Sequence, residues 1–278
     1  MSGSCEPPQL ALWALVSLPI IGESTRTRLS LHAKAGCGPD FARFIDAACG
    51  LEEDGNFSGP VSKAKGAATA RWRAASEQAG LPKVMLVALD LSHSMHGARL
   101  STCQTSLKTI LTKNMEDRDR VALVSFADDV RTEFGLTVAG PAGGTARQSM
   151  FSTVDLLGTR GGTAFYDACV VGALTLHQQL AGEPATPKWL VALTDGEDNR
   201  SRPDSARRCI GLLKSTPNLN LALITVGAIN MSVCQQFLDA TTEAGNKALL
   251  VQAKNQTEIS KAFASVAAAM DAGVAEVL

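Results

Sequence analysis

From residue 84 onward, the chain alternates short, mostly apolar segments with longer segments of helical periodicity. The apolar segments lie at 84–89, 121–126, 189–193, 221–226 and 248–251. Segments without polar alternation are typical of strands that are buried on both faces of a parallel sheet. Right-handed connections through the intervening helices then place helices on both faces. The pattern predicts an α/β fold with a doubly wound, mostly parallel, Rossmann-like sheet.

The segments between these strands predict helices, because their apolar residues recur every three or four positions. The stripes begin at Leu100, Met150, Ala164, Ala206, Cys234 and Ile259. Two helix starts carry local signals. Pro203 occupies a permitted first helical position, with Ala206, Ile210 and Leu213 predicted to be buried, and Ser232-Val233-Cys234-Gln235 fits a capping box. The segment 131–137 mixes charged and apolar residues, which favours a single antiparallel strand at the edge of the sheet.

Residues 1–80 lack this alternation and predict an N-terminal extension that is only partly ordered. It includes an expected strand at 25–32, a short helix at 41–49 and a linker near 55–75, where Gly, Ser, Ala and Lys are frequent. The domain itself is predicted to span 81–278. The apolar run at 10–21 is shorter than the roughly 20 residues of a membrane-spanning helix, so no membrane span is expected.

Charge and cysteine content narrow the class of protein. Twenty-six basic and 27 acidic side chains give a formal net charge of -1, and only one Tyr is present, so nucleic acid is not an expected partner. Seven cysteines without a Cys-x-x-Cys pair favour buried thiols in a reducing compartment. A sequon at Asn199 lies beside candidate site residues, where a glycan would crowd them. The expected location is therefore cytoplasmic, with secretion as the less favoured alternative.

Polar oxygen-bearing side chains cluster where the predicted strands end. Asp90, Ser92 and Ser94 directly follow the first strand, Thr163 precedes a long helix, and Asp195 follows another strand. In doubly wound sheets, ligands bind beyond the carboxyl ends of the strands, so the fold is expected to bring these five side chains together.

The chemistry of these groups indicates a divalent cation. Hydroxyls and carboxylates are hard oxygen ligands that suit Mg²⁺, with Mn²⁺ or Ca²⁺ as alternatives. Asp90 and Asp195 balance two positive charges, and Gly161 and Gly162 allow the backbone to approach closely. The set leaves one coordination position for an outside group, for which a carboxylate from a partner is the natural candidate.

Each segment also has a simpler interpretation. Asp90, Ser92 and Ser94 are common helix caps, Thr163 could cap the helix that it precedes, and Asp195 followed by Gly is a common turn. The three segments nevertheless occur in order, at the same predicted edge of one sheet. Their conjunction favours the metal site.

These residues resemble the metal-ion-dependent adhesion site of von Willebrand factor A domains. The resemblance is carried by Asp90-Leu91-Ser92-His93-Ser94, by Thr163 and by Thr194-Asp195-Gly196-Glu197-Asp198-Asn199, with further similarity at 119–126 and 161–168. It covers about residues 83–270, and all five ligand positions match.

The resemblance implies that Ser92, Ser94 and Thr163 bind the ion directly and that Asp90 and Asp195 bind it directly or through water. It also implies that the ion mediates binding to a Glu or Asp side chain of a protein partner. His93 departs from the family, in which this position is commonly small.

Two other functions remain as alternatives to a non-enzymatic binding module. Asp90 could act as the nucleophile of a Mg²⁺-dependent phosphotransferase or phosphatase, although Ser92 stands where such enzymes place a second acid. Alternatively, the ion serves only the stability of the fold. A zinc site is not expected, because His93 and His96 beside Cys103 do not complete a ligand set.

Overall fold

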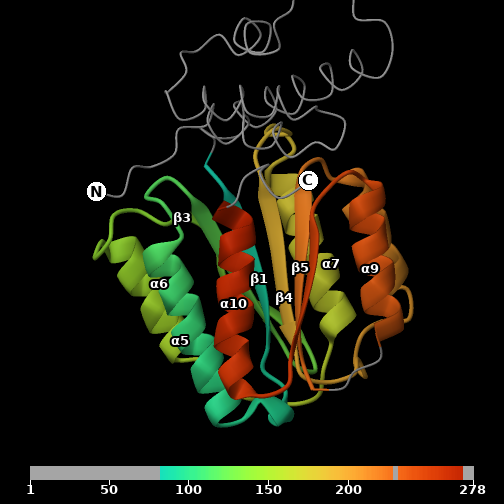
Figure 1. Ribbon diagram of the computed structural model, residues 1–278, viewed down its shortest axis with the longest axis horizontal. Helices are drawn as coiled ribbons and strands as arrows, with labels where there is room; N and C mark the ends of the chain where they lie inside the picture. Colours follow the sequence, from blue (N-terminus) through green and yellow to red (C-terminus); the bar gives the residue numbers. More distant parts are fainter. Residues whose placement is uncertain (1–81, 228–230, 272–278) are drawn as a thin grey trace, which may run out of the picture. The chain divides into compact units, whose positions relative to one another are not determined.

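The computed structural model describes residues 82–227 and 231–271, and these form a six-stranded sheet in the order β3-β2-β1-β4-β5-β6 (Figure 1). The strands are β1 (Val84–Asp90), β2 (Arg120–Phe126), β3 (Val130–Val138), β4 (Lys188–Thr194), β5 (Leu219–Val226) and β6 (Ala248–Ala253). Only β3, at one edge, runs antiparallel to its neighbour, and the other adjacent pairs are parallel. The predicted fold class and its antiparallel edge strand are confirmed.

Six helices and one short 3-10 turn cover this described sheet. They are η1 (His93–Met95), α5 (Ala98–Lys113), α6 (Thr145–Asp155), α7 (Phe165–Gln179), α8 (Ser205–Ser215), α9 (Met231–Glu243) and α10 (Gln256–Asp271). Helices α5, α6 and α10 lie on one face of the sheet, and α7 and α9 lie on the other (Figure 1). Buried side chains of α5, α6 and α10 share one apolar cluster, and those of α7, α8 and α9 share a second. Each face therefore has its own apolar core.

Alternate residues of each central strand enter opposite cores. In β1, Met85, Val87 and Leu89 belong to the core under α5, whereas Val84 and Leu86 belong to the core under α7. Every residue of β1 and β4 is buried, which explains why the segments 84–89 and 189–193 within them are continuously apolar.

The order of the strands reverses at β1, which positions the candidate site. The chain moves from β1 to β2 on one side and then returns to β4 on the other. A crevice at the carboxyl ends of β1 and β4 is the usual ligand-binding position of such sheets. Asp90 ends β1, Thr194 ends β4, and the neighbouring positions Leu89 and Leu193 pair in register.

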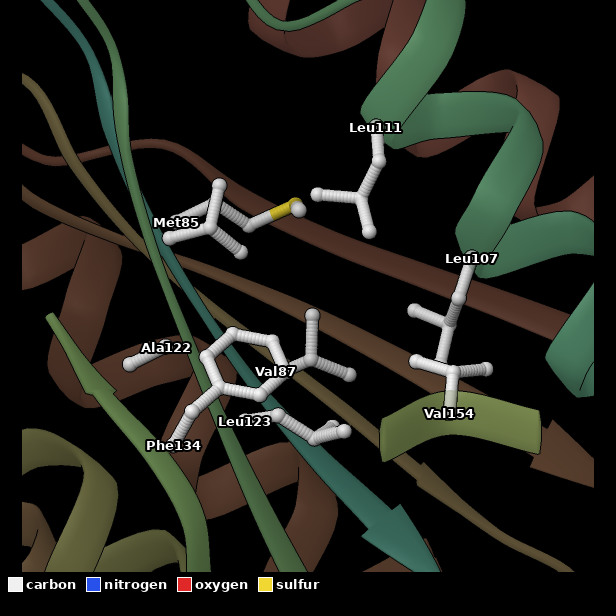
Figure 2. A pocket seen from close by; sticks show the side chains of 9 residues that line it. Met85, Val87, Leu107, Leu111, Ala122, Leu123, Phe134 and Val154 are labelled. Atoms are coloured by element: carbon white, nitrogen blue, oxygen red, sulfur yellow. The ribbon is translucent and has the colours of Figure 1, made fainter. Parts of the chain in front are cut away.

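A small apolar cavity lies elsewhere, within the core between β1–β3 and helices α5 and α6. Figure 2 shows side chains from these elements pointing toward one another, including Phe134, Leu107 and Val154. All of its lining residues are apolar, so it offers no ligand for a cation. We interpret it as imperfect packing of the core rather than as a functional pocket.

The predicted start of α8 is wrong by two residues. The helix begins at Ser205, and Pro203 is exposed in the preceding turn. Its buried stripe is Ser205, Cys209 and Leu213, whereas the predicted Ile210 is only half-buried. Ala206, predicted to be buried, is also half-buried. The Ser205 hydroxyl donates a hydrogen bond to Asp167 of α7, which turns this face of α8 inward.

The predicted capping box of α9 is also wrong. The helix already begins at Met231, which places Ser232 inside its first turn. The buried Leu157 lies beyond the end of α6 at Asp155. Gly245 has φ of +79° just beyond the end of α9, where glycine commonly ends a helix.

The elements predicted at 25–32, 41–49 and 55–75 lie outside the described residues, so the extension and its boundary stay predictions. Within the described residues, no helix is both long and apolar enough to span a membrane. In the same part of the chain Cys103, Cys169, Cys209 and Cys234 are buried free thiols, as predicted.

Candidate metal centre

Asp90 forms the buried floor of the site. Its side chain is completely shielded from solvent at the end of β1. One carboxylate oxygen accepts a hydrogen bond from the Ser92 backbone N–H at 2.8 Å, and the other accepts one from the Thr194 hydroxyl at 2.7 Å. Ser92, which follows β1, and Thr194, which ends β4, thus hold this carboxylate in one orientation.

Burial raises the pKa of Asp90 above its ordinary value of 3.8, and the nearby Asp195 carboxylate adds a smaller increase. Hydrogen bonds from Ser92 and Thr194 oppose this increase in the pKa, but they do not offset it. The ionised form of Asp90 is therefore under-stabilised in the folded protein. A divalent cation would relieve this cost.

Three further ligand candidates form a continuous chain of oxygens above Asp90. The hydroxyls of Ser92 and Ser94 are 3.0 Å apart, and Ser94 donates a hydrogen bond of 2.6 Å to Asp195 Oδ1. Ser92 is buried, whereas Ser94 is exposed. The Ser92 and Ser94 hydroxyls therefore lead from the interior to an exposed residue.

Thr163 reaches the same centre from the loop that precedes α7. Its side chain is buried, and its hydroxyl lies 3.6 Å from the point where a Cβ on Gly196 would stand. Its backbone N–H donates to Asn199 Oδ1, and its carbonyl accepts from the N–H groups of Asn199 and Arg200. These bonds place Thr163 against the Asp195–Gly196 turn.

Backbone hydrogen bonds also join the loop after β1 to the loop that precedes α7. His93 N–H donates to the Gly161 carbonyl at 3.2 Å, and Arg160 N–H donates to the Leu91 carbonyl at 2.6 Å. The structure thus brings together all five residues predicted from the sequence.

The simpler capping interpretation does not account for these side chains. Ser92 is the N-cap of η1 and Gly97 is that of α5, and neither position makes a side-chain capping hydrogen bond. Ala164, not Thr163, is the N-cap of α7, again without such a bond. The hydroxyls of Ser92 and Ser94 are instead directed to one another and to the Asp195 carboxylate.

Two glycines allow the loops to approach one another. Gly161 has φ of +57°, and a Cβ there would collide with the Asp128 carboxylate. A Cβ on Gly162 would stand 2.7 Å from Asn199 Oδ1. The close approach predicted for this Gly-Gly pair is confirmed.

Arg99 is a site residue that sequence reasoning missed. It lies in the first turn of α5, and its NH1 is 2.5 Å from Asp195 Oδ2 and 3.1 Å from the Ser94 carbonyl oxygen. The Asp195 side chain is fully covered, whereas that of Arg99 is 42% exposed. Arg99 therefore closes the solvent side of Asp195.

Asn199 and Asp198, which belong to the motif at 194–199, position the loop that precedes α7 and the start of that helix. Asn199 holds the Thr163 N–H, and Asp198 accepts hydrogen bonds from Tyr166 N–H and from Ser201. The signal in the sequence was an acidic and amide pair immediately beyond the Asp-Gly turn, in front of a helix N-terminus.

The donor set fits a hard divalent cation. It consists of two carboxylates and three hydroxyls, which Mg²⁺, Mn²⁺ and Ca²⁺ prefer over softer ligands. No group of three or more His, Cys, Asp or Glu side chains suited to a metal occurs within the described residues, so such a site depends on its hydroxyls. Burial, with smaller effects of the Asp195 and Asp90 carboxylates, raises the pKa of the Cys103 thiol to about 12.

The family described as von Willebrand factor type A domain matches residues 85–265. A comparison with curated proteins found no match. Among solved structures, a von Willebrand factor type A protein from Catenulispora acidiphila has a TM-score of 0.57 and 18% identity, with 68% of this chain and 42% of that chain covered.

Two further solved structures share the fold. The PilB minor pilin from Streptococcus sanguinis has a TM-score of 0.52 and 15% identity, covering 72% of this chain and 63% of that one. Proximal thread matrix protein 1 from the mussel byssus, solved with a zinc-occupied MIDAS motif, has a TM-score of 0.53 and 18% identity, covering 68% and 46%. This chain spans less than two thirds of each of these three structures. At such identities the likeness shows the fold alone.

Proposed function

Since this chain belongs to the von Willebrand factor type A family, whose members are metal-dependent protein-interaction modules, we propose that it binds a protein partner through a divalent cation. The observation that carries the proposal is the row of oxygens from Ser92 through Ser94 to Asp195 above the buried Asp90. No helix-capping bond accounts for the hydroxyls, and all five predicted ligands converge at one edge of the sheet.

The side chains divide the task by depth. Asp90, Ser92 and Thr163 would hold the inner side of the cation, and Ser94 and Asp195 its outer side, with Mg²⁺ the first candidate and Mn²⁺ or Ca²⁺ the alternatives. When bound, the cation supplies a Lewis-acidic contact for one carboxylate oxygen. Because Ser94 is exposed, a Glu or Asp side chain of the partner can approach from its side.

A phosphotransfer role for Asp90 is not favoured. Its carboxylate is fully buried, and both oxygens already accept hydrogen bonds from Ser92 and Thr194. In-line attack on a phosphoryl group requires an accessible oxygen. Von Willebrand factor A domains are, moreover, generally non-enzymatic.

The test is a metal-dependent pull-down from native extract with the full chain as bait. It compares Mg²⁺ with chelator for the wild type, for Asp195→Ala and for the matched control Asp239→Ala, which removes one exposed carboxylate from α9. We expect proteins that bind the wild type and the control only with Mg²⁺, and not Asp195→Ala. Circular dichroism should show that each variant is folded.

Two outcomes would contradict the proposal. Capture that is indifferent to chelator and to Asp195→Ala would leave the site without a role in binding. If Mg²⁺ raises the melting temperature of the wild type but no capture depends on it, the cation serves only the stability of the fold.

We also propose that the chain works in a reducing, cytoplasmic compartment. Its four described cysteines are buried free thiols, which supports this proposal. Asn199 Oδ1 accepts the Thr163 N–H at 3.0 Å, so a glycan on that amide would disturb the site. Cell fractionation tests the proposal, and a glycosylated secreted form would contradict it.

A further inference from the structure

The contact between Arg99 and Asp195 has a consequence for cation binding. The guanidinium lies at 2.5 Å from Asp195 Oδ2, while Ser94 occupies Oδ1. Both oxygens of one candidate ligand therefore already accept hydrogen bonds, one of them from a full positive charge. A guanidinium keeps that charge at any physiological pH, so deprotonation cannot release the contact.

Arg99 is well placed to leave this contact. Its side chain is 42% exposed, and its only other described hydrogen bond is to the Ser94 carbonyl at 3.1 Å. The long side chain can turn into water and keep its head group solvated. Partly exposed ion pairs are weak, because water competes for both partners. The contact is therefore one that a stronger cation can displace.

We propose that Arg99 is an internal competitor of the divalent cation, which it opposes by occupying Asp195 and by placing a positive charge beside the site. This inference rests on the proposed function, since it assumes a cation at these five residues. Arg99 lowers the affinity of the site and at the same time neutralises Asp195 when no cation is bound. It is a positioning and affinity-setting residue rather than a ligand.

The alternative role is purely structural, in which Arg99 only orients Asp195. The two roles predict opposite effects. If Arg99 only orients Asp195, its loss weakens cation binding. If it competes, removing its charge tightens cation binding although a hydrogen bond to Asp195 is lost. Ser94 still holds the other oxygen at 2.6 Å, so Asp195 keeps one fixed contact in either case.

The experiment is a calorimetric titration of the chelator-treated full chain with Mn²⁺ at fixed ionic strength. Arg99→Met removes the charge, Arg99→Gln is a second neutral variant, and Arg99→Lys retains the charge. The control Arg118→Met removes an exposed arginine that pairs only loosely with Glu116, at 3.6 Å, in the turn before β2. We expect the neutral variants to bind Mn²⁺ about tenfold more tightly, because a nearby like charge is removed, and the lysine and control variants to stay within a few-fold of the wild type.

A second measurement separates competition from general loosening. In chelator, the neutral Arg99 variants should melt at a lower temperature than the wild type, because Asp195 loses its counter-charge. With saturating Mn²⁺, this difference should shrink or reverse.

The outcomes distinguish the two proposals. If the wild type binds no Mn²⁺ at all, the proposed function fails. The proposed function stands if the wild type binds Mn²⁺ and Asp195→Ala does not. If, in that case, Arg99→Met and Arg99→Gln bind Mn²⁺ as tightly as the wild type or more weakly, the competition by Arg99 is overturned.

Discussion

Asp90→Asn is expected to stabilise the cation-free domain while abolishing its response to a cation. The carboxylate of Asp90 is fully buried, and its pKa is raised by that burial, so its charge costs stability. The effective penalty of burying one ion is several kcal/mol. An amide avoids this penalty with nearly the same shape.

The hydrogen bonds around Asp90 set the size of the gain. The remaining carbonyl can still accept from Ser92, and the new amide can donate to Thr194 Oγ1. The Thr194 hydroxyl can then donate to the Gly196 carbonyl, 3.1 Å away. Exchanging two charge-assisted bonds for neutral ones costs about 1 kcal/mol each. The net gain in the free energy of unfolding is therefore about 1–3 kcal/mol. For a domain of this size, each kcal/mol raises the melting temperature by roughly 2–4 °C.

The same substitution predicts a pH dependence. Because the folded pKa of Asp90 lies above 3.8, the folded state holds this proton more tightly than the unfolded state. This contribution to stability is present at low pH and is lost as the pH rises through the folded pKa. The stability advantage of Asp90→Asn over the wild type should therefore be small near pH 4 and grow toward neutral pH.

Urea denaturation in chelator at several pH values measures this difference directly, and a parallel series with Mg²⁺ measures the response to the cation. A cation-free Asp90→Asn variant that is less stable than the wild type at neutral pH would refute the reasoning. Such a result would mean that the buried carboxylate has a compensating positive partner.

Three further substitutions test separate parts of the account. Thr194→Val removes the donor to Asp90 while keeping the shape, and should lower the free energy of unfolding by about 1–3 kcal/mol in urea denaturation and weaken Mn²⁺ binding in calorimetry. Gly161→Ala should destabilise by about 1–3 kcal/mol, since φ is +57° and the new methyl group meets Asp128; an unchanged urea midpoint would argue against that strain. Phe263→Ala opens a cavity beneath α10, where the ring is almost fully buried, and should cost about 3–5 kcal/mol; a loss below 1 kcal/mol would show that α10 is not packed as described.

The fold could be predicted from the sequence because its central strands are buried on both faces. Every residue from Val84 to Asp90 is buried, so the apolar run is a direct record of that environment. Helix starts were less predictable. Pro203 and Ser232 both carry local signals of a helix start, yet α8 begins at Ser205 and α9 at Met231. For α8, packing against Asp167 of α7 decides the buried face, and no local signal encodes that contact.

The candidate ligands could be predicted because their side-chain chemistry is distinctive and the fold dictates where strands end. The residues that support these candidate ligands could not be predicted from the sequence. Arg99 and Asn199 are ordinary in the sequence, and their roles arise only when three loops meet. Arg99 is five residues from Ser94 along the chain, but its charge acts on Asp195, which follows a different strand, β4.

The central claim is that Asp90, Ser92, Ser94, Thr163 and Asp195 form one divalent-cation site. Anomalous X-ray diffraction from a crystal soaked in Mn²⁺ tests it most directly. We predict one strong anomalous peak at the carboxyl ends of β1 and β4, within bonding distance of the Ser92 and Ser94 hydroxyls. A Mn²⁺ peak bound elsewhere in the chain, with none between these hydroxyls and Thr163, would contradict the account.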